Sequence, residues 1–238
     1  MKFAVFGDIH GNIEALKAAN EAAQAAGVEK IYHLGDLGGY SPCVNEVVDF
    51  LIKHNIDGVQ GNYDETVANN AEHCGCKAED PIQEEMANKS FEWTKKHASS
   101  KTKEYLGKLP AEITFNSLGR KVALFHATPR KNNLYWYEDR TEKFFQEMAG
   151  KVDADVLIYG HTHKPYRKEH GKKIFINAGS VGKPKDGDPR ACVTLIDITT
   201  KMVNVEFLRV PYDVENAAKA IVSSGLPEYF AERLRVGK

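Results

Sequence analysis

Long hydrophobic runs are absent from this 238-residue sequence. No apolar stretch approaches the ~18 residues that a membrane-spanning helix requires, and residues 1–6 lack the basic and apolar regions of a secretory signal. Cysteine is also scarce, and the four residues show no disulfide-framework spacing: Cys43, Cys74, Cys76 and Cys192. Such usage is typical of a reducing compartment. We therefore expect a cytoplasmic protein without a membrane segment, in which the loop around Cys74 and Cys76 carries free thiols rather than a zinc site.

Charge of one sign is not in excess either. The 32 Lys and Arg residues nearly balance 33 Asp and Glu residues, which leaves a formal net charge of -1 and a pI near 6.8. This balance provides no overall attraction to nucleic acid or to an anionic membrane. A nuclease, which would need an electropositive groove, gains little support. Any affinity for phosphate must therefore come from local groups or from bound metals.

Two glycine-rich nucleotide-binding fingerprints are missing. After the first predicted strand, the glycines at Gly7 and Gly11 are too far apart for G-x-G-x-x-G. The pair Gly182-Lys183 is followed by Pro184, and Asn177 stands where a Walker A loop needs its first glycine. The sequence therefore excludes a Rossmann fingerprint and a P-loop.

Polar residues that can bind a metal are present at the ends of six predicted strands. These residues are Asp8 and His10, Asp36, Asn62, His126, His161 and His163, and Asn177. Where strands alternate with helices, binding sites form beyond the carboxyl ends of the strands, so we expect these residues to meet at one place. Carboxylate and imidazole ligands together suit a divalent cation such as Mn, Fe, Zn or Ni.

The hydrophobic periodicity predicts an α/β fold. Helices are predicted over residues 12–26 and 44–54, between strands at 2–6, 30–34 and 56–60. This β-α-β-α-β order favours a right-handed unit with parallel strands. Further strands are predicted at residues 111–118, 120–125, 155–159, 173–176, 191–197 and 203–208, the last three of which are expected to complete a second sheet.

Two helical segments extend this core within one domain of residues 1–238. An insertion at about residues 64–108 is placed to form one wall of the active cleft and is our candidate for substrate selection. A packing helix without ligand contact explains that segment equally well. A second helical segment at about residues 213–238 is expected to cover a sheet edge or a partner surface, which would allow a homo-oligomer.

The ordered motifs resemble those of the calcineurin-like metallophosphoesterase superfamily. That pattern reads DxH, GD, GN followed by His, Cys or Tyr and an acidic residue, H, and GHxH. The matching residues here are Gly7-Asp8-Ile9-His10, Gly35-Asp36, Gly61-Asn62-Tyr63-Asp64, His126 and Gly160-His161-Thr162-His163. Within the superfamily, the opening motif and the Gly39-Tyr40-Ser41-Pro42 turn resemble the YfcE-like phosphodiesterase branch, over residues 2 to roughly 210. The resemblance implies a two-sheet β-sandwich flanked by helices, with four layers in the order α/β/β/α.

The resemblance also implies two divalent cations, Mn, Fe, Zn or Ni, that share Asp36. One cation would be held by Asp8, His10, Asp36 and His163, and the other by Asp36, Asn62, His126 and His161. Two such metals can generate a bridging hydroxide near neutral pH and stabilise both oxygens of an in-line displacement. The expected activity is therefore hydrolysis of a phosphodiester or a small nucleotide-like phosphate ester.

Tyr63 differs from the residue that many superfamily phosphatases have at its position. Histidine is common at this place, where the following acidic residue, here Asp64, orients it to protonate the leaving oxygen. A phenol with an unperturbed pKa near ~10 is a poorer acid at neutral pH. We therefore expect a preference for substrates with low-pKa leaving groups. The expected catalytic residues are Asp36, Asn62, Tyr63, Asp64 and Arg130.

Residues 127–137 supply cations and aromatic rings close to His126. Arg130 is the best candidate for a phosphate clamp, and Tyr135, Trp136 and Tyr137 could stack a base or pack on the core. Asn12, Asn177, Ser180 and Lys183 are expected at the same rim, either as contacts to ligand or as ordinary turn residues.

Three other functions remain compatible with these residues. One is a nucleoside polyphosphate hydrolase of the diadenosine tetraphosphate type, since acid assistance matters less when the leaving group is a phosphate. Another is a protein phosphatase. The third is a catalytically weak protein that binds a phosphate ligand.

Overall fold

The computed structural model describes residues 1–75 and 80–238, and the expectation about Cys76 lies outside the described residues. Its centre is a pair of five-stranded sheets. The first sheet has the order β10-β9-β1-β2-β3, with β1 Lys2–Phe6, β2 Lys30–His33, β3 Asp57–Gly58, β9 Ala191–Ile198 and β10 Val203–Val210. The second sheet has the order β4-β5-β6-β8-β7, with β4 Glu112–Ser117, β5 Arg120–Phe125, β6 Val156–Tyr159, β7 Tyr166–His170 and β8 Lys173–Asn177.

The helices begin where the sequence provides capping groups. Asn12, Asp80, Ser99, Thr141 and Asp213 each accept a backbone N–H of the helix that follows. The described helices are α1 Ile13–Ala25, α2 Val44–Lys53, α3 Asn62–Ala68, α4 Pro81–His97, α5 Ser100–Lys108, α6 Glu142–Ala149, α7 Val214–Ser223 and α8 Glu228–Arg235.

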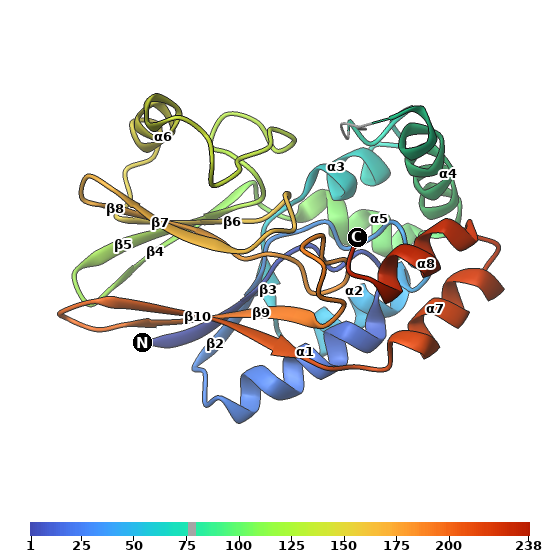
Figure 1. The fold of residues 1–238 in the computed structure, drawn as a ribbon, viewed down its shortest axis with the longest axis horizontal. Coiled ribbons are helices and arrows are strands. Elements are labelled where there is room, and N and C mark those ends of the chain that lie inside the picture. The colour runs from blue at the N-terminus through green and yellow to red at the C-terminus, as the bar shows by residue number, and fades with distance from the viewer. Residues whose placement is uncertain (76–79) are drawn as a thin grey trace.

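The two sheets pack face to face and are covered by helices on their outer sides (Figure 1). Alternate residues of β1 point in opposite directions: Phe3 and Val5 join the core between the sheets, whereas Ala4 and Phe6 pack towards α1 and α2. On the far side of the second sheet, α6 packs in a third core that includes Trp136. The layer order is α/β/β/α, as expected.

Parallel pairing brings several strand ends to one edge of the sandwich. In the first sheet β1, β2 and β3 are parallel neighbours, and in the second sheet β5, β6 and β8 are. The residues that follow these strands therefore emerge together (Figure 1). The insertion that contains α3, α4 and α5 lies at this same end of the molecule, beside α7 and α8.

One expectation about the sheets is wrong, and one strand was missed. The strands β9 and β10 belong to the first sheet, where β9 pairs antiparallel with β1 over Lys2–Phe6, and only β8 of the three joins the second sheet. The strand β7 was not predicted, because its alternation of exposed and buried residues is carried by charged side chains. Hydrophobic periodicity identifies a strand but carries no information about its partner.

The cysteine expectation is wrong at one position. Cys43 and Cys192 are free thiols, whereas Cys74 is disulfide-bonded. A single disulfide does not produce the repeated spacing by which a framework is recognised in a sequence.

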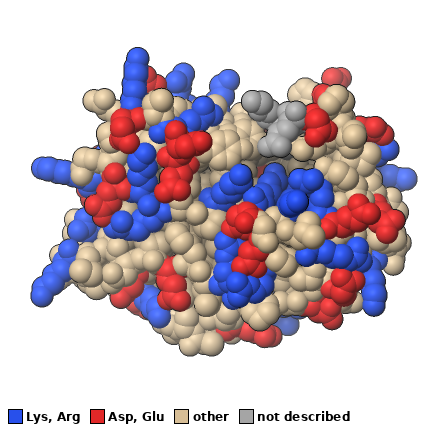
Figure 2. All heavy atoms as spheres, viewed as in Figure 1, with Lys and Arg blue, Asp and Glu red and all other residues tan. Residues whose placement is uncertain are grey.

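Charges of both signs alternate over much of the face seen in Figure 2, in keeping with the balanced composition. The middle of this face differs, because several Lys and Arg side chains lie there side by side, near the C-terminus marked in Figure 1. None of the helices in the described parts of the chain is long and apolar enough to cross a membrane.

Candidate metal centre

The first group of potential metal ligands consists of Asp8, His10 and His163. All three are buried, and their ligand atoms lie within 4.8 Å of one another. His163 Nε2 is 3.4 Å from Asp8 Oδ1 and 3.2 Å from His10 Nε2. Residues from the first and fifth predicted strand ends, more than 150 positions apart in the chain, therefore meet as the sequence analysis expects.

The second group consists of Asp36, His126 and His161, again buried and within 4.8 Å of one another. His126 Nε2 lies 3.1 Å from His161 Nδ1 and 3.0 Å from Asn62 Oδ1. Asn62 opens α3, and its amide nitrogen donates to the carbonyl of Cys74. This bond turns the amide oxygen of Asn62 towards His126.

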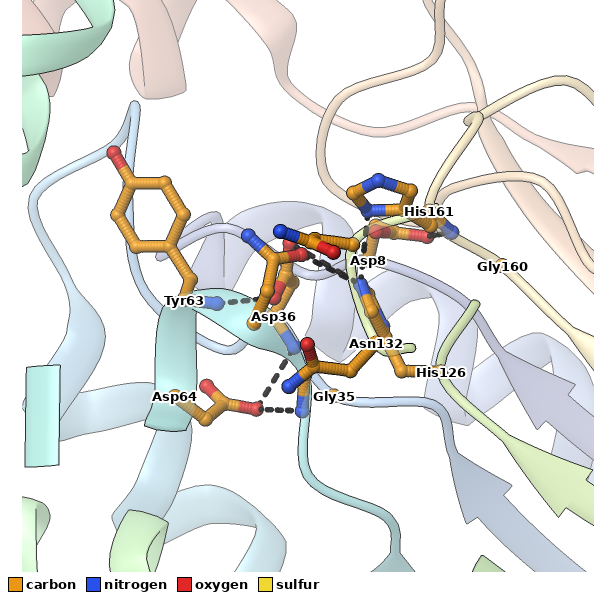
Figure 3. A network of polar contacts seen from close by, with 12 residues as sticks. Asp8, Gly35, Asp36, Tyr63, Asp64, His126, Asn132, Gly160 and His161 are labelled. Carbon is orange, nitrogen blue, oxygen red and sulfur yellow. Dashed lines mark hydrogen bonds and ion pairs between the residues drawn. The ribbon is translucent and has the colours of Figure 1, made fainter. Parts of the chain in front are cut away.

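Asp36 lies between the two groups. Its Oδ2 is 3.9 Å from His10 Nε2 in the first group and 3.6 Å from His126 Nε2 in the second. A second link runs through Asp8, whose Oδ2 accepts the backbone N–H of His161 at 2.9 Å. The two groups therefore form one continuous cluster, of which Figure 3 shows Asp8, Asp36, His126 and His161.

Backbone carbonyls orient three of the imidazole rings. The Nδ1 atom of His10 faces the carbonyl of Gly38 at 2.8 Å, that of His126 faces Leu34 at 2.7 Å, and that of His163 faces Lys183 at 2.5 Å. A carbonyl can only accept, so each Nδ1 carries the hydrogen. Rings held in this way direct Nε2 into the cluster, as ligating histidines do.

Two buried contacts in the first group indicate that a cation would be stable between its residues. Burial lowers the pKa of both His10 and His163 well below the usual value, so both rings are neutral. Since each donates through Nδ1, their Nε2 lone pairs face each other across 3.2 Å. Asp8 Oδ1 is also buried and has no hydrogen-bond partner in the described structure. Facing acceptors repel unless a cation lies near them, and the donor set of carboxylate and imidazole suits a divalent metal.

The backbone is strained at five of these residues. Positive φ angles occur at Asp8 (25°), His10 (48°), Asp36 (51°), His161 (67°) and His163 (59°). Each such conformation costs of order 1–3 kcal/mol for a residue other than glycine, and such residues cluster at functional sites. The surrounding fold therefore holds these side chains in positions that the local chain would not adopt.

Close packing against a carboxylate explains why glycine occurs in two of the motifs, at Gly61 and Gly160. A Cβ atom on Gly61 would lie 2.2 Å from Asp36 Oδ1, and one on Gly160 would lie 2.6 Å from Asp8 Oδ2. Because real Cβ atoms do not approach other atoms so closely, only glycine leaves room for these carboxylates.

Asp64 supports the Asp36 loop. Its carboxylate accepts the backbone N–H groups of Asp36, Leu37 and Gly61, each at 2.9 Å (Figure 3). Hydrogen bonds to a charged acceptor contribute more than neutral ones. Asp64 therefore positions Asp36 and the start of α3.

Tyr63 is buried, and its ring packs edge-on against His10 with ring centroids 5.8 Å apart. Its backbone N–H donates to Asp36 Oδ1 at 2.9 Å, while its hydroxyl lies 3.1 Å from Ser90 Oγ in α4. Figure 3 shows the ring pointing away from His126 and His161. Burial raises the pKa of Tyr63 above its ordinary value. In this conformation its phenol does not reach a leaving group at the cluster.

The protonation of the cluster depends on Asp36 and His126. Burial raises the pKa of Asp36 to about 7, and the nearby Asp8 adds to this, although His126 opposes it. Burial alone would lower the pKa of His126, but Asp36 and Asp8 outweigh it, and the net shift is upward. Burial lowers the pKa of His161 well below its usual value.

A cavity of about 590 Å³ lies beside the cluster. Tyr135, whose ring centroid is 4.2 Å from that of His161, and Tyr40, 4.7 Å from that of His10, both line it. Thr162 and Lys183 line it as well, and α4 contributes Gln83 and Ala87. The helical insertion thus forms part of the cavity wall.

The structure places the expected substrate-contacting residues differently. Arg130 is exposed and is not among the residues that line the cavity. Trp136 is buried against Tyr159 at 4.4 Å, whereas Tyr135 and Tyr137 line the cavity. The cations that do line it were mostly missed by sequence analysis, because they lie far apart in the chain: Arg140, Lys164, Lys183, Lys185, Arg233 and Lys238.

The polar residues expected at the rim instead hold loops in place. Asn12 caps α1 and donates to the carbonyl of Gly182. Asn177 donates to the carbonyl of Gly160, and Ser180 donates to the carbonyl of Asp8. These three side chains fix the backbone on either side of the metal ligands.

A family comparison agrees with the geometry of this cluster. Residues 1–201 match the calcineurin-like phosphoesterase superfamily domain. The chain belongs to this superfamily, and within it to the YfcE-like branch.

Three known proteins illustrate the relationship. An uncharacterised protein of Methanocaldococcus jannaschii is 33% identical and is aligned over 99% of this chain and 98% of its own. The phosphodiesterase YfcE of Escherichia coli K12 is 25% identical over 79% of this chain and 84% of its own. The crystal structure of a metallophosphoesterase from Sphaerobacter thermophilus superposes with a TM-score of 0.81 at 25% identity, covering 100% of this chain and 99% of the other.

This membership gives the cluster its chemical context. Calcineurin-like phosphoesterases are metal-dependent hydrolases of phosphate esters, and this chain contains candidate metal-ligand groups in the matched domain.

Proposed function

We propose that this protein is a binuclear metal-dependent phosphoesterase that hydrolyses phosphodiesters or small nucleotide-like phosphate esters. The proposal is carried by the position of Asp36 Oδ2, which lies within 4 Å of a ligand nitrogen of each group. One carboxylate oxygen at this place is suited to two cations at the short separation of two-metal sites.

Each ligand has a role in this proposal. Asp8, His10 and His163 would hold one cation, Asn62, His126 and His161 the other, and Asp36 both. When bound, the cations would lower the pKa of a shared water and neutralise charge that develops on phosphate oxygens. The backbone contacts of the histidines and of Asp64 keep the ligands in place before metal arrives. This preorganisation limits the reorganisation needed for catalysis.

Metal removal and restoration test the proposal. Protein stripped with a chelator should not hydrolyse bis-p-nitrophenyl phosphate, and Mn²⁺ or Ni²⁺ should restore turnover. Asp36→Asn should abolish that recovery, whereas His170→Ala, which removes a partly exposed histidine paired with Glu142, should not. Absence of metal-restored turnover in the unaltered protein would favour a catalytically weak phosphate-binding protein.

A second candidate function is hydrolysis of nucleoside polyphosphates. It is favoured by the six cations that line the cavity, more than one phosphate group needs, and by the lack of acidic residues among the described residues that line it. A phosphate leaving group also needs less help from an acid, which accords with the buried position of Tyr63.

The position of Tyr63 leads to a leaving-group prediction. Since its hydroxyl is hydrogen-bonded to Ser90, it does not act as an acid, and rates should fall steeply as the pKa of the leaving group rises. Tyr63→Phe should leave turnover of aryl diesters within about twofold, because it removes no group that reaches the substrate. Rates across a series of substituted aryl esters would measure both effects. A flat dependence would show that another acid assists departure.

A further inference from the structure

The cavity beside the metal ligands has a strongly cationic lining that extends beyond the cluster. Its six Lys and Arg residues come from four parts of the chain, whereas none of the residues that line it within 1–75 and 80–238 is acidic. Figure 2 shows Lys and Arg side chains gathered in the middle of the face, near the end of α8. Arg140, Lys164, Lys183 and Arg233 form no ion pair with any residue in the described ranges.

Lys183 places a buried cation in this lining, which costs free energy when no anionic ligand is bound. Its side chain is only 8% exposed, and its Nζ lies 4.6 Å from the centre of the Tyr40 ring. Lys185 and Arg233 are both cationic and disfavour its charge, whereas Asp8 favours it. A buried charge is normally paired, so the cavity fits a ligand that brings several negative charges.

Arg233 reaches this cavity from α8, outside the residues that match the superfamily domain. The helix is held firmly in place. Phe230 is buried and packs on Tyr40 with ring centroids 5.3 Å apart. The backbone N–H of Gly187 donates to the carbonyl of Gly237 at 3.0 Å, which ties the end of the chain to the loop that carries Lys183 and Lys185.

A third contact joins the C-terminal helices to α4. Trp93 Nε1 donates to the carbonyl of Ser224, at the end of α7, at 3.0 Å. The wall formed by α8 is therefore positioned by contacts to the Tyr40 turn, the 183–190 loop and α4. A cation on such a wall is held at a constant place relative to the metal ligands, as a specificity contact must be.

We propose that Arg233 binds a second phosphate group of the substrate, and that α8 thereby selects phosphate esters that carry more than one phosphate. The proposal rests on the function proposed above and specifies its substrate class. The scissile phosphate lies at the cluster, and the further phosphates extend along the cations towards α8. The volume of about 590 Å³ falls within the range of small-molecule sites and accommodates a nucleoside polyphosphate. Hydrolysis adds water to one phosphorus and breaks its bond to the bridging oxygen, which leaves on the remaining phosphate chain.

Comparison of two substrates tests this assignment. ATP carries further phosphates, whereas bis-p-nitrophenyl phosphate carries one. In the metal-loaded protein, Arg233→Gln should lower kcat/KM for ATP about tenfold and leave that for the diester unchanged within about twofold. Arg233→Lys should recover most of the loss, because it keeps the charge.

Arg235→Gln is the matched control on the same helix. Arg235 pairs with Glu215 and does not line the cavity, so this variant should leave both substrates unaffected. An equal loss on both substrates in Arg233→Gln would indicate a structural role and overturn the proposal, as would no loss on either.

A binding measurement separates this proposal from the proposed function. Inorganic tripolyphosphate, titrated calorimetrically into metal-free protein, should bind the unaltered chain and Arg235→Gln equally, and Arg233→Gln about tenfold more weakly. If tripolyphosphate binds all three alike while ATP turnover falls, Arg233 contacts the nucleoside and the phosphate assignment is wrong. If the protein hydrolyses no phosphate ester, the proposed function fails, but this titration still decides whether Arg233 binds phosphate.

Discussion

Asp36 couples the two ligand groups through one buried side chain. Its position between His10 and His126 makes metal binding depend on its protonation state. Burial raises the pKa of Asp36 to about 7, so in the metal-free protein it carries a proton at lower pH. A cation must displace that proton before it can bind.

This competition predicts the pH dependence of metal affinity. Below the pKa of Asp36, the apparent Kd for Mn²⁺ should rise about tenfold per pH unit for the one proton displaced, and above it the Kd should level off. His126, whose pKa is also raised, should steepen the trend at low pH. Calorimetric titrations on both sides of pH 7 would measure it. A Kd that does not change with pH would contradict the proposed protonation of Asp36.

Asp64 is a second single residue on which the site depends, because it holds the backbone around Asp36. Asp64→Asn keeps the shape of the side chain but removes its charge. One carboxylate oxygen becomes an NH₂ group, which cannot accept the backbone N–H groups that donate to Asp64 in the unaltered protein. We expect a loss of about 2–4 kcal/mol in the free energy of unfolding, together with weaker metal binding. Urea unfolding would measure the first quantity. Tyr63→Phe is the comparison, since it loses one hydroxyl contact and should cost about 1 kcal/mol.

At the scale of elements, the ligands are placed by the turns that follow parallel strands. These turns require positive φ angles and very close backbone approach, which accounts for the glycines of the motifs. The sequence indicated these turns correctly, because glycine next to a ligand residue is a local signal. It did not indicate that β9 and β10 join β1, because strand pairing is decided by segments almost 200 residues apart.

Gly61 provides a test of turn packing. Gly61→Ala would place a methyl group 2.2 Å from Asp36 Oδ1 and 2.3 Å from its backbone nitrogen, so α3 and the Asp36 loop would have to separate. We expect the free energy of unfolding to fall by about 3 kcal/mol or more and metal binding to be lost.

Gly107 is the control for that substitution. It lies inside α5, where an added Cβ would meet only Ala68 Cβ at an ordinary 3.5 Å. Gly107→Ala should therefore stabilise the protein by about 0.5–1 kcal/mol. Thermal unfolding of both variants checks the pair, and similar effects of the two substitutions would disprove the packing argument.

For the whole molecule, metal binding should stabilise the fold. The ligands come from both sheets, so a bound cation links the two halves of the sandwich and is lost when they separate. Mn²⁺ at 100 times its Kd should add about 2.7 kcal/mol per site to the free energy of unfolding. Thermal unfolding with and without Mn²⁺ measures this gain, and Asp36→Asn should lose most of it. An unchanged melting temperature in the unaltered protein would argue against a metal site.

The sequence by itself determined the ligand types, their order and the alternation of strands with helices. These properties depend on local chemistry: apolar periodicity marks the strands, and glycine marks the tight turns beside Asp8, Asp36 and Asn62. The superfamily and the layer order followed from them.

Only the tertiary structure decided which side chains line the cavity. It buried Tyr63 against Ser90, left Arg130 exposed, and brought Arg233 of α8 beside Lys183. These outcomes depend on how distant segments pack, because a side chain's environment is set by elements that approach it from elsewhere in the chain. No local pattern around residue 233 could have indicated that it lines the same cavity as Tyr40 and Lys183.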